Sequence, residues 1–235
     1  MKIDKWSYSR LKTFTQIKTN ERKMEFMRKE PERSIDNHGT SSCTAGSAYH
    51  EVLALWLNAK KIGVEVSLEH TTLKEKMKTK TAQRKFESFL KNFSENKKVY
   101  EEILEDSEIL GVEISFTEKI SVGTITPNIP CEGRIDLIVK DPEDKNSLII
   151  IDHKTSSFES RYCNTFDTWQ PYISTLLVEK GTGKKVSKVL QIENNISRKP
   201  KINTRSFMMK ADDRAYYARM IKNRLNEFLR MAEAA

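Results

Sequence analysis

One short segment restricts the fold of this chain more than any other. Residues 148–151 (Leu-Ile-Ile-Ile) form a continuous apolar run, which is typical of a central strand buried on both faces of a sheet. Asp152, His153 and Lys154 follow at once, and the alternation of side chains along a strand places Asp152 and Lys154 on the same face. A carboxylate and an amine at the end of a buried strand need partners or a function. We therefore expect a site there.

A second carboxylate precedes this segment. Asp136 lies within the expected strand Gly133–Lys140, and the polar turn at 141–144 predicts that this strand pairs with the next one as a hairpin. Asp136, Asp152 and Lys154 would then converge. Such a group is suited to Mg²⁺, which prefers oxygen ligands and commonly uses one or two protein carboxylates beside a substrate phosphate. The alternative is a surface hairpin with an ordinary Asp–Lys pair, as is common at exposed strand edges.

The order of the other expected elements predicts a mixed α/β fold. Helical patterns dominate residues 1–109, short strands and one helix fill residues 110–194, and a strand and a helix close the chain at 195–235, all within one domain, 1–235. The further expected elements are helices at 5–28, 44–60, 71–108, 164–180 and 212–231, and strands at 112–120, 186–193 and 204–209. This order predicts a mixed β-sheet flanked by helices, with a helical N-terminal region.

The charge balance favours a polyanionic partner. The formal net charge is +8 and the isoelectric point is near 9.2, which bears on association with nucleic acid rather than on fold. Residues 71–108 carry many lysines followed by glutamates, and this region is either a solvated outer face over packed residues or a DNA-contacting surface. Further basic residues recur near the C-terminus: Arg214, Arg219, Lys222, Arg224 and Arg230.

The cysteine spacing and the hydropathy of the sequence bear on the cellular compartment of the protein. Cys43, Cys131 and Cys163 form no C-x-x-C pair, which argues against a disulfide framework and a structural zinc site. The longest apolar helical run, Val52–Leu57, is far shorter than the roughly 18 residues that span a bilayer, and the first twelve residues lack the apolar core of a signal peptide. We expect a cytoplasmic, intracellular protein without membrane contact.

The site segment resembles the PD-(D/E)XK nucleases, and specifically their RecB-type exonuclease branch. The branch pattern G-x-[IV]-D followed by [DE]-x-K-T is matched at 133–136 and 152–155. Further pieces occur in the family's order: an opening S-x-S-x-L-x-x-F-like stretch at 7–14, a G-x-x-x-H element from Gly46 to His50, and a Q…Y element at Gln170 and Tyr172. The resemblance implies a restriction-endonuclease-like fold.

The resemblance also implies roles for individual residues. Asp136 and Asp152 would bind the metal, joined by the backbone carbonyl of His153, and Lys154 would position the attacking water. His50 would be a further metal or phosphate contact. Glu113 would be a ligand or a support for one, with Glu118 as a competing candidate, and Gln170 and Tyr172 would bind DNA. We expect Arg134 to point to the opposite face of its strand and to be structural.

The function implied is that of an Mg²⁺-dependent deoxyribonuclease, more an exonuclease than a site-specific endonuclease, which hydrolyses phosphodiester bonds with a metal-activated water. Mn²⁺ is the expected substitute. Two alternatives stay open: a DNA-binding module that keeps the nuclease fold, and a subunit of a repair, recombination or CRISPR-type complex. Relatives with an iron–sulfur cluster use four cysteines, so three scattered ones predict no iron–sulfur cluster here. No Walker-type motor motif is present, so unwinding would need a helicase partner; a phage or mobile-element origin fits this small form.

Overall fold

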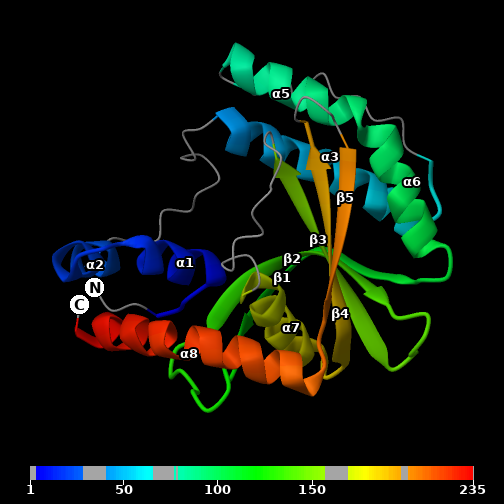
Figure 1. Cartoon of the computed structure of the whole chain (residues 1–235). Helices are drawn as coiled ribbons and strands as arrows, with labels where there is room; N and C mark the ends of the chain where they lie inside the picture. Colours follow the sequence, from blue (N-terminus) through cyan, green and yellow to red (C-terminus); the bar gives the residue numbers. More distant parts are fainter. Residues whose placement is uncertain are drawn as a thin grey trace.

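A five-stranded mixed sheet forms the centre of the protein. The computed structural model, shown in Figure 1, describes residues 4–28, 41–65, 77, 79–156, 169–196 and 201–234. The strands lie in the order β1-β2-β3-β4-β5. Their bounds are β1 Ile109–Glu118, β2 Cys131–Lys140, β3 Ser147–Ser156, β4 Lys185–Asn195 and β5 Lys201–Met208. The β3–β4 pair is parallel and the other three pairs are antiparallel. The mixed sheet expected from the sequence is thus confirmed.

Helices cover both faces of this sheet. The described residues contain α1 Tyr8–Gln16, α2 Asn20–Arg28, α3 Ser41–Lys61, α5 Lys80–Lys91, α6 Phe93–Leu104, α7 Trp169–Thr182 and α8 Ala211–Ala234. Figure 1 shows α3, α5 and α6 on one side of the sheet and α7 with α8 on the other. None of these helices combines the length and hydropathy needed to cross a bilayer.

The central position of β3 explains its apolar run. Ile149 and Ile151 pack into the core under α3, α5 and α6, whereas Leu148 and Ile150 pack into a second core on the α7 side. Alternate side chains of a strand point to opposite faces, so both faces of β3 must be apolar. The charged residues can therefore begin only where the strand leaves these two cores, at Asp152.

Two long helical regions expected from the sequence are each divided. The first helix is interrupted at 17–19, so α1 and α2 are separate. In the basic region, Asn92 ends α5, and its side-chain amide donates to Asn194 Oδ1 at 3.0 Å and to the carbonyl of Asn195 at 3.3 Å. This link to the end of β4 fixes the break. The part of that region at 71–76, and the expected helix start at 164–168, lie outside the described residues.

The two ends of the chain pack on each other through helices. Phe14 of α1 and Phe228 of α8 meet edge to face with ring centroids 5.3 Å apart. Lys23 of α2 donates to Glu227 of α8 at 2.6 Å. The first and last helices therefore form a layer beside α7, to which Trp169 and Ile173 contribute buried side chains. Of the three cysteines, Cys131 is buried and free.

A glycine allows α3 to approach β3 closely. A Cβ atom on Gly46 would lie 2.4 Å from Thr155 Oγ1, far inside van der Waals contact. His50 lies one helical turn after Gly46, on the same face of α3. The glycine therefore sets how near His50 comes to the end of β3, which is the physical content of the G-x-x-x-H spacing.

Gly46→Ala should lower the free energy of unfolding by about 1–3 kcal/mol, because the added methyl overpacks the contact with Thr155. In an open helix the same change would raise it by about 1 kcal/mol, so the sign of the effect tests the contact. Thr155→Ala in the same chain should recover most of the loss, and Glu51→Ala on the exposed face of α3 is the control. Urea unfolding of Gly46→Ala, of Thr155→Ala, of the double variant and of the control measures the coupling between the two positions. Additive losses in the double variant would contradict the contact.

Candidate metal and catalytic site

The site begins where the pairing of β2 and β3 ends. Their register runs from Lys140–Leu148 to Leu137–Ile151 and goes no further. At the next position the carboxylate of Asp136 accepts a hydrogen bond from the backbone N–H of His153, with Oδ2 2.7 Å from N. A side chain thus replaces the next rung of the ladder. This bond fixes Asp136 against the end of β3.

Three possible ligand side chains meet at this point. One ligating atom each from His50, Glu113 and Asp136 lies within 4.8 Å of the other two, and all three residues are half-buried. They come from α3, β1 and β2. The β1–β2 register runs through Val112–Leu137 and Ile114–Ile135, which puts Glu113 across from Asp136. We call these three residues the metal cluster.

The backbone at Glu113 is unusual. Its φ is 54°, in the left-handed region that residues with a side chain rarely adopt. Among the described residues it is the one non-glycine residue with a positive φ. Such conformations persist where the surroundings impose them, and they gather at functional sites. Glu118, the competing candidate, pairs with Cys131 at the far end of β1 and is not in the cluster.

Asp152 lies beside the metal cluster, and its carboxylate accepts hydrogen bonds from three side chains. Lys154 Nζ lies 2.9 Å from both carboxylate oxygens. Gln170 Nε2 donates to Oδ1 at 2.8 Å, and Gln191 Nε2 donates to Oδ2 at 3.0 Å. Gln170 also accepts from Lys154 Nζ at 2.9 Å, so it joins both members of the pair. Asp152 and Lys154 thus share a face, and α7 and β4 hold them.

Electrostatics distinguish these acidic groups. Burial, with a smaller contribution from the nearby Asp136, raises the pKa of Glu113 to about 7. Burial also raises the pKa of Asp152, and Lys154 opposes that rise. Burial lowers the pKa of His50, so its imidazole is neutral at pH 7 and has a lone pair to offer. A divalent cation would relieve the repulsion among the acidic groups.

His153 belongs to the other face of β3. Tyr100 of α6 hydrogen-bonds to His153 Nδ1, and the rings of His50 and His153 lie with centroids 5.6 Å apart. Burial, followed by the effect of His50, lowers the pKa of His153 well below its usual value, so its ring is neutral. The His153 ring therefore packs against the His50 ring and supports it. A ligand role for its backbone carbonyl stays a prediction.

Arg134 lies nearer the site than expected, and Tyr172 is buried away from it. Arg134 does not point away from the site: its Nε lies 2.7 Å from Glu113 Oε2. It precedes Asp136 by two residues, and residues two apart on a strand share a face, which is why the expected placement was wrong. Tyr172 is buried at 4% exposure and packs against Tyr217 of α8. The structure does not bring it to the cluster, and this placement gives no support to a DNA contact.

Gln191 has a place in the site that the motifs did not indicate. It lies opposite Asp152 in the parallel β3–β4 register and is 4% exposed. The one signal in the sequence is a glutamine within a strand that is otherwise apolar at this point, between Leu190 and Ile192. A buried amide needs a partner, but the sequence does not show which residue provides it.

The donor set fits a divalent cation. Two carboxylates and a neutral imidazole within 4.8 Å of one another offer oxygen and nitrogen ligands. Oxygen ligands suit Mg²⁺, and the added imidazole suits Mn²⁺ and related ions. Burial raises the pKa of Glu113 to about 7 even though Arg134 contacts it, so a bound cation would stabilise the ionised carboxylate.

A mixed sheet flanked by helices, with carboxylates and a lysine at the end of a central hairpin, defines the restriction-endonuclease-like class of fold. The chain belongs to the PD-(D/E)XK nuclease superfamily, whose family model matches residues 5–234.

A solved structure agrees with this fold. A candidate exonuclease from Eubacterium rectale is similar with a TM-score of 0.59 and 11% identity, covering 98% of this chain and 82% of that one. The protein SSO0001 is 15% identical over 92% of this chain and 84% of its own, but its TM-score of 0.37 is too low to bear on the fold. None of the curated proteins matches this sequence.

Metal affinity should depend on pH through Glu113. Between its usual value of 4.5 and about 7, Glu113 holds a proton in the folded protein that it has lost in the unfolded chain, so without metal its contribution to stability falls as pH rises through this window. A cation must displace that proton. Mn²⁺ affinity should therefore fall as pH drops below about 7, with proton release on binding.

Glu113→Gln should bind Mn²⁺ more weakly at about pH 8 and lose the pH dependence near 7, because the amide has no proton to release. Calorimetric titration in two buffers of different ionisation enthalpy measures both quantities. Glu118→Gln, at the far end of β1, should behave as the wild type. Equal proton release from the wild type and Glu113→Gln would contradict the assignment.

Gln191→Met keeps the side-chain volume but removes the hydrogen-bond donor to Asp152 Oδ2. The pKa of Asp152 should therefore rise further, and the rate of nucleic-acid cleavage should fall about tenfold. The acidic limb of the activity profile should then move to higher pH while the fold, followed by circular dichroism, is retained. Glu193→Gln on the same strand is the control. An unmoved pH profile with lower activity would show that Gln191 only packs.

Proposed function

We propose that the protein is an Mg²⁺-dependent deoxyribonuclease that acts as an exonuclease, with Mn²⁺ as a substitute metal. The observation that supports this most is the metal cluster His50, Glu113 and Asp136 beside the Asp152–Lys154 pair at the end of β3. Membership of the nuclease superfamily supports hydrolysis of nucleic acid. DNA as the substrate rests on the resemblance to RecB-type exonucleases.

The residues divide the chemistry among them. A divalent cation held by His50, Glu113 and Asp136 would place positive charge beside a phosphodiester and lower the pKa of a water molecule. Asp152 lies next to this cluster and is the further ligand that the motif implies. Lys154 is held between Asp152 and Gln170, so its ammonium group is oriented before substrate arrives. Such preorganised charge stabilises developing negative charge at low reorganisation cost.

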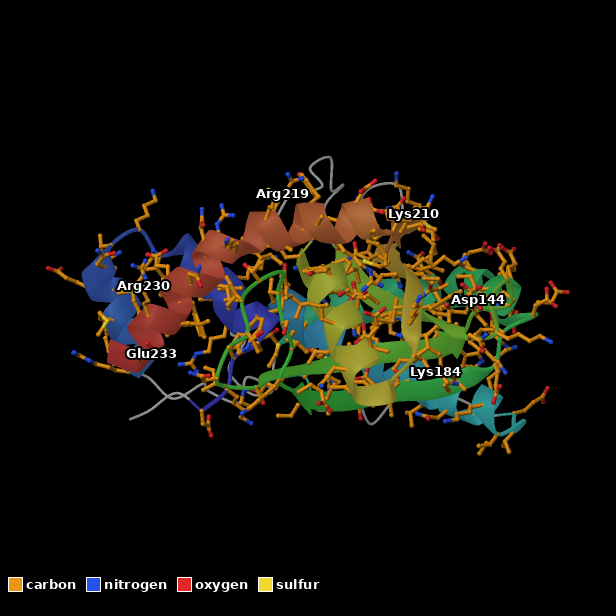
Figure 2. The ribbon with its side chains drawn as sticks, turned by 90° about the horizontal axis from the view of Figure 1, so that it is seen from below. Asp144, Lys184, Lys210, Arg219, Arg230 and Glu233 are labelled. Atoms are coloured by element: carbon orange, nitrogen blue, oxygen red, sulfur yellow. The ribbon has the colours of Figure 1, made fainter. Side chains whose placement is uncertain are left out.

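Exposed basic side chains on and next to α8 could bind the phosphates of a nucleic-acid strand. Figure 2 shows Lys210 just before the start of α8 and Arg219 and Arg230 along this helix, and Lys222 is also exposed. Two other arginines of this helix are structural. Arg214 makes a twofold contact with Glu179 at 2.7 Å, and Arg224 lies over the Trp169 ring at 4.7 Å. Binding through the exposed cations should weaken steeply as salt rises.

Two other functions use the same fold. One is a DNA-binding module without turnover, and the other is a subunit of a repair, recombination or CRISPR-type complex that works with a helicase. Both aspartates and the lysine are present, and Lys154 contacts Asp152, which favours the enzyme over the binding module. The fold alone does not distinguish an exonuclease from an endonuclease, so that choice needs an assay.

End-labelled linear DNA and covalently closed circular DNA should be incubated with Mg²⁺, with Mn²⁺ and with EDTA. We expect loss of linear DNA with either metal, none with EDTA, and intact circles. Asp152→Asn and Lys154→Met should each lower the rate at least about a hundredfold, because each removes charge at the reacting phosphate.

Matched controls lie at the other end of the sheet. Asp144→Asn and Lys184→Met make the same chemical changes in the turns before β3 and β4, where Figure 2 shows both side chains, and they should keep full activity. Cutting of circles would contradict the exonuclease proposal. DNA binding without metal-dependent cleavage of DNA or RNA would contradict the enzyme and favour the binding module.

A further inference from the structure

Arg134 lies beside the metal cluster and is exposed. It stands on β2 opposite Ser115 of β1, two residues before Asp136 and on the same face. Its contact with the cluster is an ion pair between its Nε and Glu113 Oε2, 2.7 Å apart. The guanidinium is also among the charged groups that act on His50. It therefore lies within electrostatic reach of two members of the cluster.

The environment of Arg134 differs from that of a structural arginine. Arg214 is the comparison within this chain: its Nε, Nη1 and Nη2 all donate to protein acceptors, and its side chain is 27% exposed. The side chain of Arg134 is 59% exposed. Within the described part of the chain its side chain makes no other hydrogen bond or ion pair, so its two terminal amino groups remain available to an outside acceptor.

A phosphodiester that approaches the acidic residues of the site needs a positively charged side chain nearby. Glu113, Asp136 and Asp152 place negative charge where a phosphodiester, itself an anion, would have to lie. Of the cations acting on His50, Lys154 is already engaged by Asp152 and Gln170. Arg134 is the other. A guanidinium has a planar fork of donors that matches the oxygens of a phosphate, and its charge does not titrate.

We propose that Arg134 binds a phosphate group of the nucleic-acid strand next to the metal cluster, and so is a substrate-contacting residue. The proposal rests on the proposed nuclease function of the same site. Occupation of the cluster assists the contact, because a cation bound by Glu113 neutralises that carboxylate and weakens its hold on Arg134. The ion pair with Glu113 then serves as the resting position of the guanidinium in the absence of metal and substrate.

The test pairs a protein change with a DNA change. The probes are short fluorescein-labelled duplexes, either unmodified or with one neutral methylphosphonate at one of the terminal linkages in turn, and binding is followed by anisotropy with Ca²⁺ and with EDTA. Arg134→Gln should weaken binding of the unmodified duplex about tenfold and reduce the slope of log affinity against log salt by about 1. Arg134→Lys should recover part of the affinity.

One methylphosphonate position should identify the contact. At that linkage the wild type should lose affinity and Arg134→Gln should lose no more, because the partner of the lost charge is already absent. Arg22→Gln, the same change at an exposed arginine of α2, should keep the full methylphosphonate effect. Additive losses at every position would overturn the proposal.

Metal binding separates substrate contact from support of Glu113. Arg134→Gln removes a positive charge beside Glu113, so Mn²⁺ affinity measured by calorimetry should stay equal or rise. A fall in Mn²⁺ affinity with unchanged DNA affinity would mean that Arg134 only positions Glu113 and would overturn the proposal. If the wild type binds DNA but cleaves none, the proposed function fails, and the binding measurements still decide the role of Arg134.

Discussion

At the end of β3 the carboxylate of Asp136 lies within Coulombic reach of two others, Glu113 and Asp152, in surroundings that exclude much of the water. Like charges in such surroundings repel and resist ionisation. The neighbouring groups offset this repulsion: Lys154 and two glutamine amides on Asp152, the His153 N–H on Asp136, and Arg134 on Glu113. The negative charge of Glu113 is only partly offset, so a bound cation would stabilise this carboxylate the most.

The two layers of helices each hold one part of this arrangement. On the α7 side, Gln170 and the Asp152–Lys154 pair form one connected group. On the α3 side, His50 approaches because Gly46 lets the helix lie against Thr155, and Tyr100 holds His153 beneath it. Asp136 joins the two groups where β2 and β3 stop pairing. The division of β3 between two apolar cores thus determines which residues reach the site from each side.

Local patterns in the sequence determine part of this picture. The apolar run before Asp152 predicted a central strand, and period-two alternation predicted that Asp152 and Lys154 share a face. The same rule, applied with the correct two-residue spacing, places Arg134 beside Asp136. Gln191 was not predictable, because its partner Asp152 lies across a parallel crossover with no local signal. The burial of Tyr172 likewise depends on α8. The break at 17–19 has a local signal that the helical pattern hid, because the Thr19 hydroxyl accepts from the Arg22 N–H and caps α2.

We propose above all that His50, Glu113 and Asp136 form one metal site adjoining Asp152. Anomalous diffraction from crystals soaked in Mn²⁺ locates the ion without reference to activity. We expect one strong peak within bonding distance of a ligand atom from each of the three residues, and loss of that peak in Asp136→Asn. A peak elsewhere on the protein, or none at Mn²⁺ concentrations that saturate calorimetric binding, would contradict it.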